Sequence, residues 1–265
     1  MAEYLNRDIK AIITEFPAVA DILGRYDIGC VSCGLGTCLF KDVVAIHDLS
    51  AEEEAALMAG IAGILYPGRD VVIPATARQD RPKTVGTRYS PPLQKLVDEH
   101  GLIKRWVAII PEFIENLDIA TEAGRQEIRQ GIDFIRSFAD KYHHAKEEAI
   151  LFKYFDESLD IIKIMCADHE NARARVREML AALERQDRET IATHLKAYRD
   201  LLTEHIKKED EVLYRWMDRN LSTSQVGKLF AAFSEKDGEF GGAPKNYEDF
   251  IIHLEKKYKI MEVSK

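Results

Sequence analysis

A short internal repeat constrains the fold of this chain more than any other feature of its sequence. Residues 142–152 read YHHAKEEAILF, and residues 204–214 read EHIKKEDEVLY. Aligned on their acidic pairs, both segments follow the order His, any, any, Lys, Glu, acid, and both end in Leu and an aromatic residue. A repeat of this kind predicts two equivalent structural units.

Each copy places a histidine four positions before a glutamate: His143 before Glu147, and His205 before Glu209. A helix turns by about 100° per residue, so residues four apart lie on the same face, one turn apart. Each copy therefore offers one imidazole and one carboxylate that can be directed at one point.

The acidic pair of the first copy leaves a choice of register, because His144 also precedes Glu148 by four positions. Only the frame of His143 superposes on the second copy. We therefore expect His143 and Glu147 to point inward, and His144 and Glu148 to be more exposed. In the second copy Asp210 is a weaker candidate, because it follows the histidine by five positions.

A second pattern, acid, His, three residues and base, occurs at residues 99–104 and again at 168–173. It adds His100 and His169 to His143 and His205. We call this pattern the short motif, and the repeat at residues 142–152 and 204–214 the long motif. Along the chain the motifs alternate short, long, short, long, on four successive helical stretches. That order is expected of an antiparallel four-helix bundle whose halves are related by pseudo-twofold symmetry.

Periodicity and capping residues predict an all-α fold, since strand patterns are nearly absent. The bundle is predicted at 91–220, with helices over 92–117, 122–156, 159–185 and 187–220. Ser90 is the expected N-cap with Pro91 at the first helical position, Pro111 is expected to end or kink the first helix, and Asp187 to cap the fourth. Lys146 and Lys208 are expected to lie off the face that carries the histidines.

Three further segments flank the bundle. Residues 1–66 are predicted to form a small helical domain containing cysteines, in which Pro17 separates two short helices and Ser50 caps a helix reaching Leu65. Residues 67–90, rich in Pro and Arg, are predicted to be a linker. Residues 221–265 are predicted to be a helical extension, with a short helix over 222–234, a loop over 238–244 and a terminal helix over 246–260.

Charge and cysteine usage narrow the class of protein. The net charge of −8 disfavours nucleic acid and anionic membranes as partners. The first residues lack an apolar signal core, and no run approaches the length of a membrane span, so we expect a cytoplasmic protein. Cys30, Cys33 and Cys38 cluster while Cys166 lies far away, which does not suggest a disulfide framework.

The side chains of the two motifs form a candidate set of metal ligands. The set consists of His100, His143, Glu147, His169, His205 and Glu209. Imidazole and carboxylate together suit iron. With two imidazoles per iron, both carboxylates bridging and one oxo or hydroxo bridge, about five octahedral positions per iron are filled and about one stays open to dioxygen or nitric oxide. Burial of these groups without a metal would be costly.

These motifs resemble those of the hemerythrin-like HHE family, four-helix bundles that hold a non-haem di-iron centre of the Fe–O–Fe type. The resemblance covers about residues 90–218 and implies that the six side chains above are the iron ligands. Oxygen-carrying hemerythrins have five histidines at this site. We identify no convincing fifth from the sequence, so simple reversible oxygen carriage is not the leading expectation.

The N-terminal segment resembles the short cysteine-bearing domain of the RIC family (repair of iron centres), which is implicated in restoring damaged iron–sulfur clusters. The resemblance rests on Phe16, Pro17, Tyr26, Asp27, Ile28 and the cysteines that follow. The family has adjacent cysteines, whereas Cys30 and Cys33 form a CxxC with Cys38 five residues on. These thiols could hold a transient metal or iron–sulfur cluster, exchange disulfides or deliver iron; the alternative is a structural role.

Three functions follow from these observations. The leading expectation is repair of iron–sulfur proteins after nitrosative or oxidative stress, with iron–sulfur client proteins as partners. The alternatives are a sensor or scavenger of dioxygen or nitric oxide, and a reductase of nitric oxide or peroxide, so whether the chain is an enzyme stays open. A homodimer is also expected.

Overall fold

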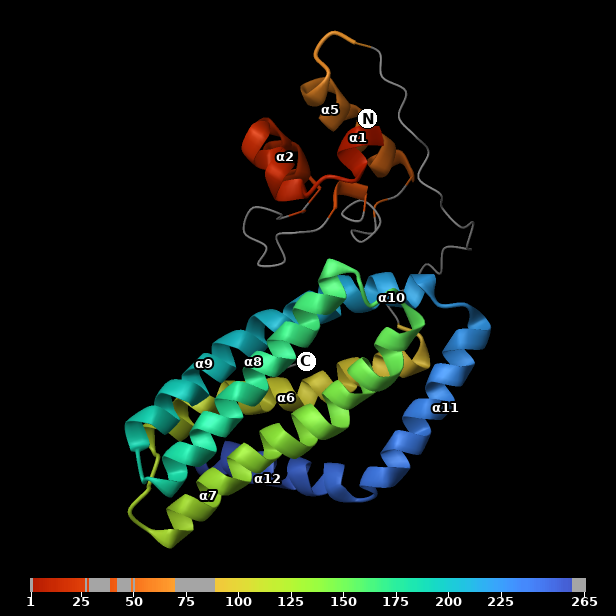
Figure 1. The fold of residues 1–265 in the computed structure, drawn as a ribbon. Helices are drawn as coiled ribbons and strands as arrows, with labels where there is room; N and C mark the ends of the chain where they lie inside the picture. The colour runs from red at the N-terminus through yellow and green to blue at the C-terminus, as the bar shows by residue number, and fades with distance from the viewer. Residues whose placement is uncertain are drawn as a thin grey trace.

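The computed structural model describes residues 2–26, 28, 39–41, 49, 51–69 and 89–258. Within these ranges the regular structure is helical, apart from one isolated bridge between Asp8 and Leu39, which confirms the all-α prediction (Figure 1). No helix of the described ranges is both long enough and apolar enough to cross a membrane.

The N-terminal part has a small apolar core of its own. It contains α1 (Ala2–Leu5), α2 (Ile9–Glu15), α3 (Ala18–Gly24) and α5 (Ala51–Leu65). Pro17 separates α2 from α3, as predicted, and the Asp8 side chain caps α2. The buried core includes Ile12, Leu23 and Ile61. The predicted cap Ser50 and all three clustered cysteines lie outside the described residues, so their roles stay predictions.

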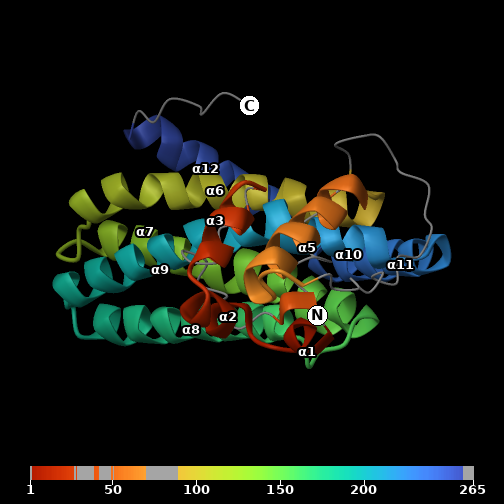
Figure 2. The same cartoon turned by 90° about the horizontal axis from the view of Figure 1, so that it is seen from above.

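The next four helical rods form the predicted bundle. They are α6 (Pro91–Glu115); α7 (Glu122–Asp133) continued by η1 (Phe134–His144), η2 (Glu147–Leu151) and η3 (Phe152–Tyr154); α8 (Asp160–Glu184); and α9 (Arg188–Lys208) continued by η4 (Glu209–Leu213) and α10 (Tyr214–Asn220). The rods lie side by side in both views (Figures 1 and 2). Asp187 caps α9 as predicted. Ser90 is the N-cap residue of α6, as predicted, but its side chain makes no cap hydrogen bond. Pro111 does not end α6, which continues to Glu115.

The long motif does not lie on ordinary α-helix. The segments η1, η2 and η4 are π-helical, and two of them begin at the two motif glutamates, Glu147 and Glu209. A π-helical turn takes more residues than an α-helical one and is frequently found at functional sites. Both copies of the repeat therefore share a local widening that helical periodicity could not predict.

The C-terminal extension is more continuous than predicted. Helix α11 (Thr223–Phe240) begins with a capping box at Ser222 and runs through Gly238, and α12 (Ala243–Tyr258) follows almost at once. The predicted loop over 238–244 is therefore wrong, because the break is confined to the turn at Gly241, whose φ is +52°. Gly238 is tolerated inside the helix, since contacts made by Asp237 and Phe240 hold this end of α11 on the bundle.

Two apolar clusters lie on either side of the motif histidines. On α6, Leu96 belongs to one cluster and Ile103 to the other, with His100 between them. On α8, Met165 and Ala172 flank His169 in the same way. The bundle therefore carries its polar interior between two layers of buried hydrocarbon.

Close packing of α6 on the second rod gives a first prediction. A Cβ at Gly131 would lie 2.8 Å from Trp106 Cη2 and 3.3 Å from Phe113 Cζ. We expect Gly131→Ala to destabilise the bundle by about 1–3 kcal/mol, because the indole must shift in a filled core. Gly101→Ala is the matched control: nothing lies within 4 Å of its Cβ, and helix propensity favours alanine by roughly 1 kcal/mol. Urea unfolding of both variants tests this, and equal effects would contradict it.

Candidate metal centre

All six predicted ligand side chains converge in the interior of the bundle. They are His100 from α6, His143 and Glu147 from the second rod, His169 from α8, and His205 and Glu209 from the fourth rod, and none is more than 1% exposed. The four helices therefore bring the short and the long motifs to one place.

The converging atoms form two groups. His144, His169 and His205 make one group, and His100, His143, Glu147 and Glu209 make the other. Within each group, one ligand atom from every residue lies within 4.8 Å of the others. Glu209 links the groups, because its Oε2 lies 3.2 Å from His205 Nε2 and 3.3 Å from His100 Nε2.

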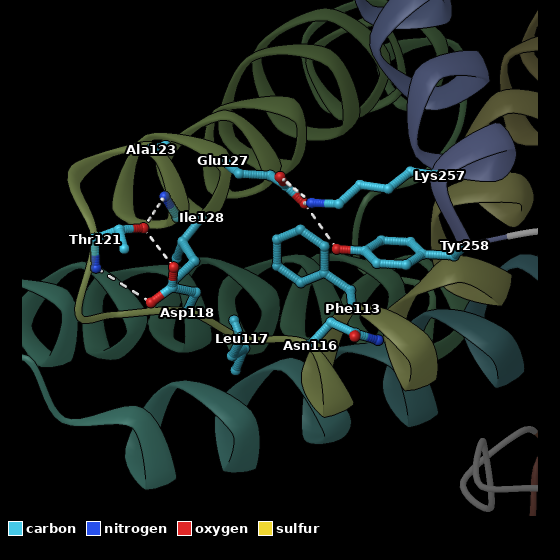
Figure 3. A pocket seen from close by; sticks show the side chains of 11 residues that line it. Phe113, Asn116, Leu117, Asp118, Thr121, Ala123, Glu127, Ile128, Lys257 and Tyr258 are labelled. Carbon is cyan, nitrogen blue, oxygen red and sulfur yellow. Dashed lines mark hydrogen bonds and ion pairs between the residues drawn. The ribbon is translucent and has the colours of Figure 1, made fainter.

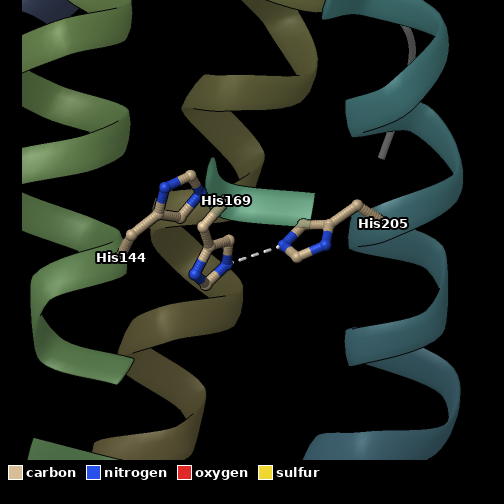
Figure 4. Close-up of side chains that lie close together, drawn as sticks. All are labelled: His144, His169 and His205. Carbon is tan, nitrogen blue, oxygen red and sulfur yellow. Dashed lines mark hydrogen bonds between the residues drawn. The ribbon is translucent and has the colours of Figure 1, made fainter. Parts of the chain in front are cut away.

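His144 corrects the sequence-based expectation that it is exposed. Its side chain is buried, and its ring stacks on His169 with centroids 3.9 Å apart (Figure 4). The expectation failed because it assumed α-helical spacing; in π-helical η1, neighbouring side chains diverge less, so His143 and His144 both reach the interior. The bundle therefore contains the fifth imidazole that the sequence analysis did not identify. Glu148 is also only half-exposed, because it contacts His169.

Each of the five imidazoles has a carboxylate beside its Nδ1. The pairs are His100 with Asp210 at 2.7 Å, His143 with Glu99 at 3.0 Å, His144 with Asp140 at 3.6 Å, His169 with Glu148 at 2.6 Å, and His205 with Asp168 at 3.4 Å. Four of these contacts are within hydrogen-bond distance, whereas His144 Nδ1 has no hydrogen-bond partner among the described residues. A carboxylate hydrogen-bonded at Nδ1 favours the tautomer that carries its proton there, which leaves the Nε2 lone pair for a metal.

These supporting carboxylates explain the acids of both motifs. The acid that precedes the short-motif histidine contacts a long-motif histidine, as Glu99 does with His143. The acid that follows the long-motif glutamate contacts a short-motif histidine, as Asp210 does with His100. The second half repeats both contacts. In the sequence these acids hold equivalent positions in both halves of the repeat. Only the packing of the helices shows that each acid contacts a histidine of the other motif.

The inward nitrogens of two rings face each other. His169 Nε2 lies 3.0 Å from His205 Nε2 (Figure 4). If both rings carry their proton on Nδ1, this contact sets two lone pairs together, and only a proton or a metal cation between them makes it favourable. Two nitrogens bound at about 2.1 Å to one metal and at right angles would lie about 3 Å apart. The observed separation therefore fits two ligands of a single ion.

Several other buried atoms lack a hydrogen-bond partner within the part of the chain that the structure describes. Five of these atoms belong to the candidate ligands: Nε2 of His100 and His143, Oε2 of Glu147, and both carboxylate oxygens of Glu209. Burying such groups unpaired is costly, and buried polar atoms without partners are rare in native proteins. Five such atoms gather at one place, on the side chains of four candidate ligands, so the residues present fit a metal centre.

The two buried glutamates differ in charge. Burial and the nearby Glu209 raise the pKa of Glu147 well above its ordinary value. Burial acts in the same direction on Glu209, but His205 and His100 outweigh it and hold the pKa of Glu209 well below its usual range. Metal-free protein therefore protonates one carboxylate of the pair, and metal binding must displace that proton.

Tyr214 is a functional candidate that the sequence analysis missed. Its buried ring stacks on His100, with centroids 5.5 Å apart, and its hydroxyl donates to Glu147 Oε1. The equivalent residue in the first copy is Phe152, which stacks on His169 but has no hydroxyl. The aligned repeat contains this signal: the two halves differ where tyrosine replaces phenylalanine, and where His144 corresponds to isoleucine.

The charge of His205 gives a second prediction. Burial lowers its pKa, but Glu209 and Asp168 outweigh this effect and raise the pKa to about 9. The proton stabilises the metal-free fold fully below the unfolded pKa of about 6.5, and this stabilisation is lost as the pH rises through about 9. We expect the free energy of unfolding of metal-free protein to fall between those pH values, and to fall less in His205→Gln. Urea titrations across this range test it, and identical slopes would contradict it.

Two other polar side chains of the bundle do not belong to either ligand group. Cys166 is half-exposed and free, and the buried Tyr198 hydroxyl has no hydrogen-bond partner among the described residues. A pocket of about 190 Å³ opens near the turn between α6 and α7, lined partly by Asp118, Lys257 and Tyr258 (Figure 3). None of the candidate ligands lines this pocket.

The fold and the site define a class of protein: an antiparallel four-helix bundle whose interior gathers imidazoles and carboxylates from all four rods. Residues 92–217 match the Hemerythrin HHE cation binding domain. The comparison does not confirm the resemblance to RIC proteins, which stays a prediction.

Two relatives extend the similarity beyond the bundle. They are the uncharacterized protein Rv1995 of Mycobacterium tuberculosis and the uncharacterized protein Mb2018 of Mycobacterium bovis. Each is 24% identical over 221 residues, which cover 78% of this chain and 87% of the relative. No solved structure matches the chain significantly.

Proposed function

We propose that the bundle holds two iron ions as a non-haem di-iron centre and that this centre binds or reduces a small molecule: dioxygen, nitric oxide or peroxide. His144, His169 and His205 would hold one iron, and His100 and His143 the other. Glu147 and Glu209 would be shared. The observation that carries the proposal is the set of five buried imidazoles gathered with two buried glutamates, four of them hydrogen-bonded to a carboxylate through Nδ1.

The donor set favours iron over softer metals. It contains nitrogen and oxygen ligands, and within the described residues no thiol joins it. Bound iron would supply a redox-active Lewis acid with an exchangeable coordination position. The chain itself supplies the orientation of the imidazoles, through the five carboxylates, and the exclusion of water, through the apolar clusters on either side.

The two halves of the site are unequal. One group has three imidazoles, while the other has two and lies beside the Tyr214 hydroxyl. The half with two imidazoles is therefore where we place the small molecule. Reversible oxygen binding was not the leading expectation because no fifth histidine was identified in the sequence. The buried His144 supplies that histidine, so reversible oxygen binding is among the functions to be tested.

Metal analysis together with gas titration tests the proposal. We expect about two irons per chain after anaerobic loading, and a change in the visible spectrum when dioxygen or nitric oxide is added. A change that reverses on removal of the gas indicates sensing or storage. Sustained consumption with an electron donor indicates reduction. Protein that binds no iron, or whose iron spectrum ignores all three molecules, would contradict the proposal.

Replacing His144 tests the inequality of the two halves. His144→Ile introduces the residue found at the equivalent position, Ile206, and leaves two imidazoles in each group. We expect the variant to keep its fold, to bind one of the two irons at least tenfold more weakly, and to show an altered spectrum. Iron titration monitored by absorbance measures this. Unchanged affinity and spectrum would show that His144 is not a ligand.

Repair of iron–sulfur clusters is the second candidate, and the three clustered thiols favour it. Cys30, Cys33 and Cys38 could accept or deliver iron or a cluster while the di-iron centre handles the oxidant. We expect the purified protein to restore a damaged iron–sulfur enzyme, and Cys30→Ala or Cys33→Ala to impair this. Failure to restore activity under reducing conditions would leave small-molecule chemistry as the function.

A further inference from the structure

We propose that helix α11 of the C-terminal extension is part of the metal centre: Asp237 holds the buried Lys146 against Glu99, and Glu99 thereby positions His143. This inference rests on the proposed metal-binding function and goes beyond it, since α11 lies outside the matched HHE region, which ends at residue 217.

Lys146 is the centre of this network. Its side chain is fully buried, and its ammonium contacts Glu99 Oε1 and lies 2.6 Å from Asp237 Oδ1. It also lies 3.5 Å from the centre of the Tyr142 ring, whose hydroxyl donates to Asp237 at 2.7 Å. A buried ammonium is tolerated only when it is paired, so Lys146 depends on both carboxylates.

Glu99 carries the effect of this network to the candidate ligands. Its Oε2 lies 3.0 Å from His143 Nδ1, while its Oε1 is bound by Lys146. With both oxygens engaged, the carboxylate is fixed in orientation, and with it the ring whose Nε2 is directed inward. Supporting contacts of this kind commonly change metal affinity by about 10–100-fold when they are removed.

The pseudo-symmetric half of the site lacks this support. Lys208 is the equivalent of Lys146, and Asp168 that of Glu99. The Lys208 ammonium lies 3.7 Å from Asp168, and its side chain is 21% exposed. Helix α11 packs on α6, η1 and η2, which belong to the half that contains Lys146 (Figure 1). The extension therefore buries one lysine of the repeat and leaves the other partly exposed.

The alternation of charge explains the part played by Asp237. Lys95, Asp237, Lys146 and Glu99 follow one another as cation, anion, cation, anion. Removing the Asp237 charge leaves the buried Lys146 with a single carboxylate partner. Glu99 must then compensate that ammonium alone, and its orientation toward His143 loosens.

The test compares substitutions in the two halves by iron titration of the full-length protein. We expect Asp237→Asn to weaken one of the two bound irons by about 10–100-fold and to shift the iron spectrum, and Asp237→Glu to recover most of the loss. Lys208→Met is the matched control for Lys146→Met: we expect it to bind iron within about threefold of the wild type, whereas Lys146→Met behaves like Asp237→Asn.

The outcomes separate this inference from the proposed function. Wild-type protein that binds no iron defeats the proposed function itself. Wild-type protein that binds two irons, with Asp237→Asn equal to it or Lys208→Met as damaging as Lys146→Met, overturns only the role of α11. If Asp237→Asn does not fold, Tyr142→Phe replaces it, because it removes one hydrogen bond to Asp237 and keeps the ring. We expect it to weaken the same iron about threefold, and unchanged binding overturns the inference.

Discussion

Replacing Glu209 by alanine is expected to reduce metal affinity by more than about a hundredfold, the largest loss of any single substitution in the bundle. Its carboxylate contacts His205 and His100, one from each group, and neither oxygen has a hydrogen-bond partner among the described residues. In the proposed centre, loss of this shared group would remove a ligand from both ions, so the expected loss exceeds the 10–100-fold typical of a supporting residue. Equilibrium dialysis followed by metal analysis measures it.

Glu211→Ala is the matched control for this substitution. Glu211 lies two residues further along η4, is exposed, and belongs to neither ligand group. We expect its metal content to equal that of the wild type. If Glu209→Ala retained two metals per chain at wild-type affinity, the shared role of this carboxylate would be wrong.

Removing the metal is expected to lower the melting temperature of the bundle by about 10 °C. A ligand present at a thousand times its dissociation constant stabilises the folded state by about 4 kcal/mol. In a protein of this size each kcal/mol corresponds to roughly 2–4 °C. The loss arises because the inward nitrogens and carboxylates are left buried without their cation.

Tryptophan fluorescence is suited to this measurement. Trp106 lies in α6 and Trp216 in α10, and the chain has 2 tryptophans, so the signal reports on the bundle and not on the N-terminal part. Glu209→Ala provides the control, since a chelator should hardly change its melting temperature. Equal melting of metal-loaded and chelator-treated wild-type protein would contradict a metal-stabilised bundle.

Helical periodicity and capping residues predicted the four helices of the bundle well. Periodic apolar residues and the cap at Asp187 placed the four helices within a few residues of their observed ends. They failed at Gly238, where tertiary contacts of Asp237 outweigh the low helix propensity of glycine. They failed also at His144, because the choice of register assumed the spacing of an α-helix.

The sequence by itself determined the types of the candidate ligands, their pairing within each helix and the twofold repetition, because all of these depend on spacing along one helix. Only the tertiary structure decided which carboxylate supports which imidazole, that His144 is buried, and that α11 covers Lys146 but not Lys208. These are contacts between residues far apart in the chain. They depend on how the helices pack and on where a helix becomes π-helical. Neither can be predicted from the periodicity of a single segment.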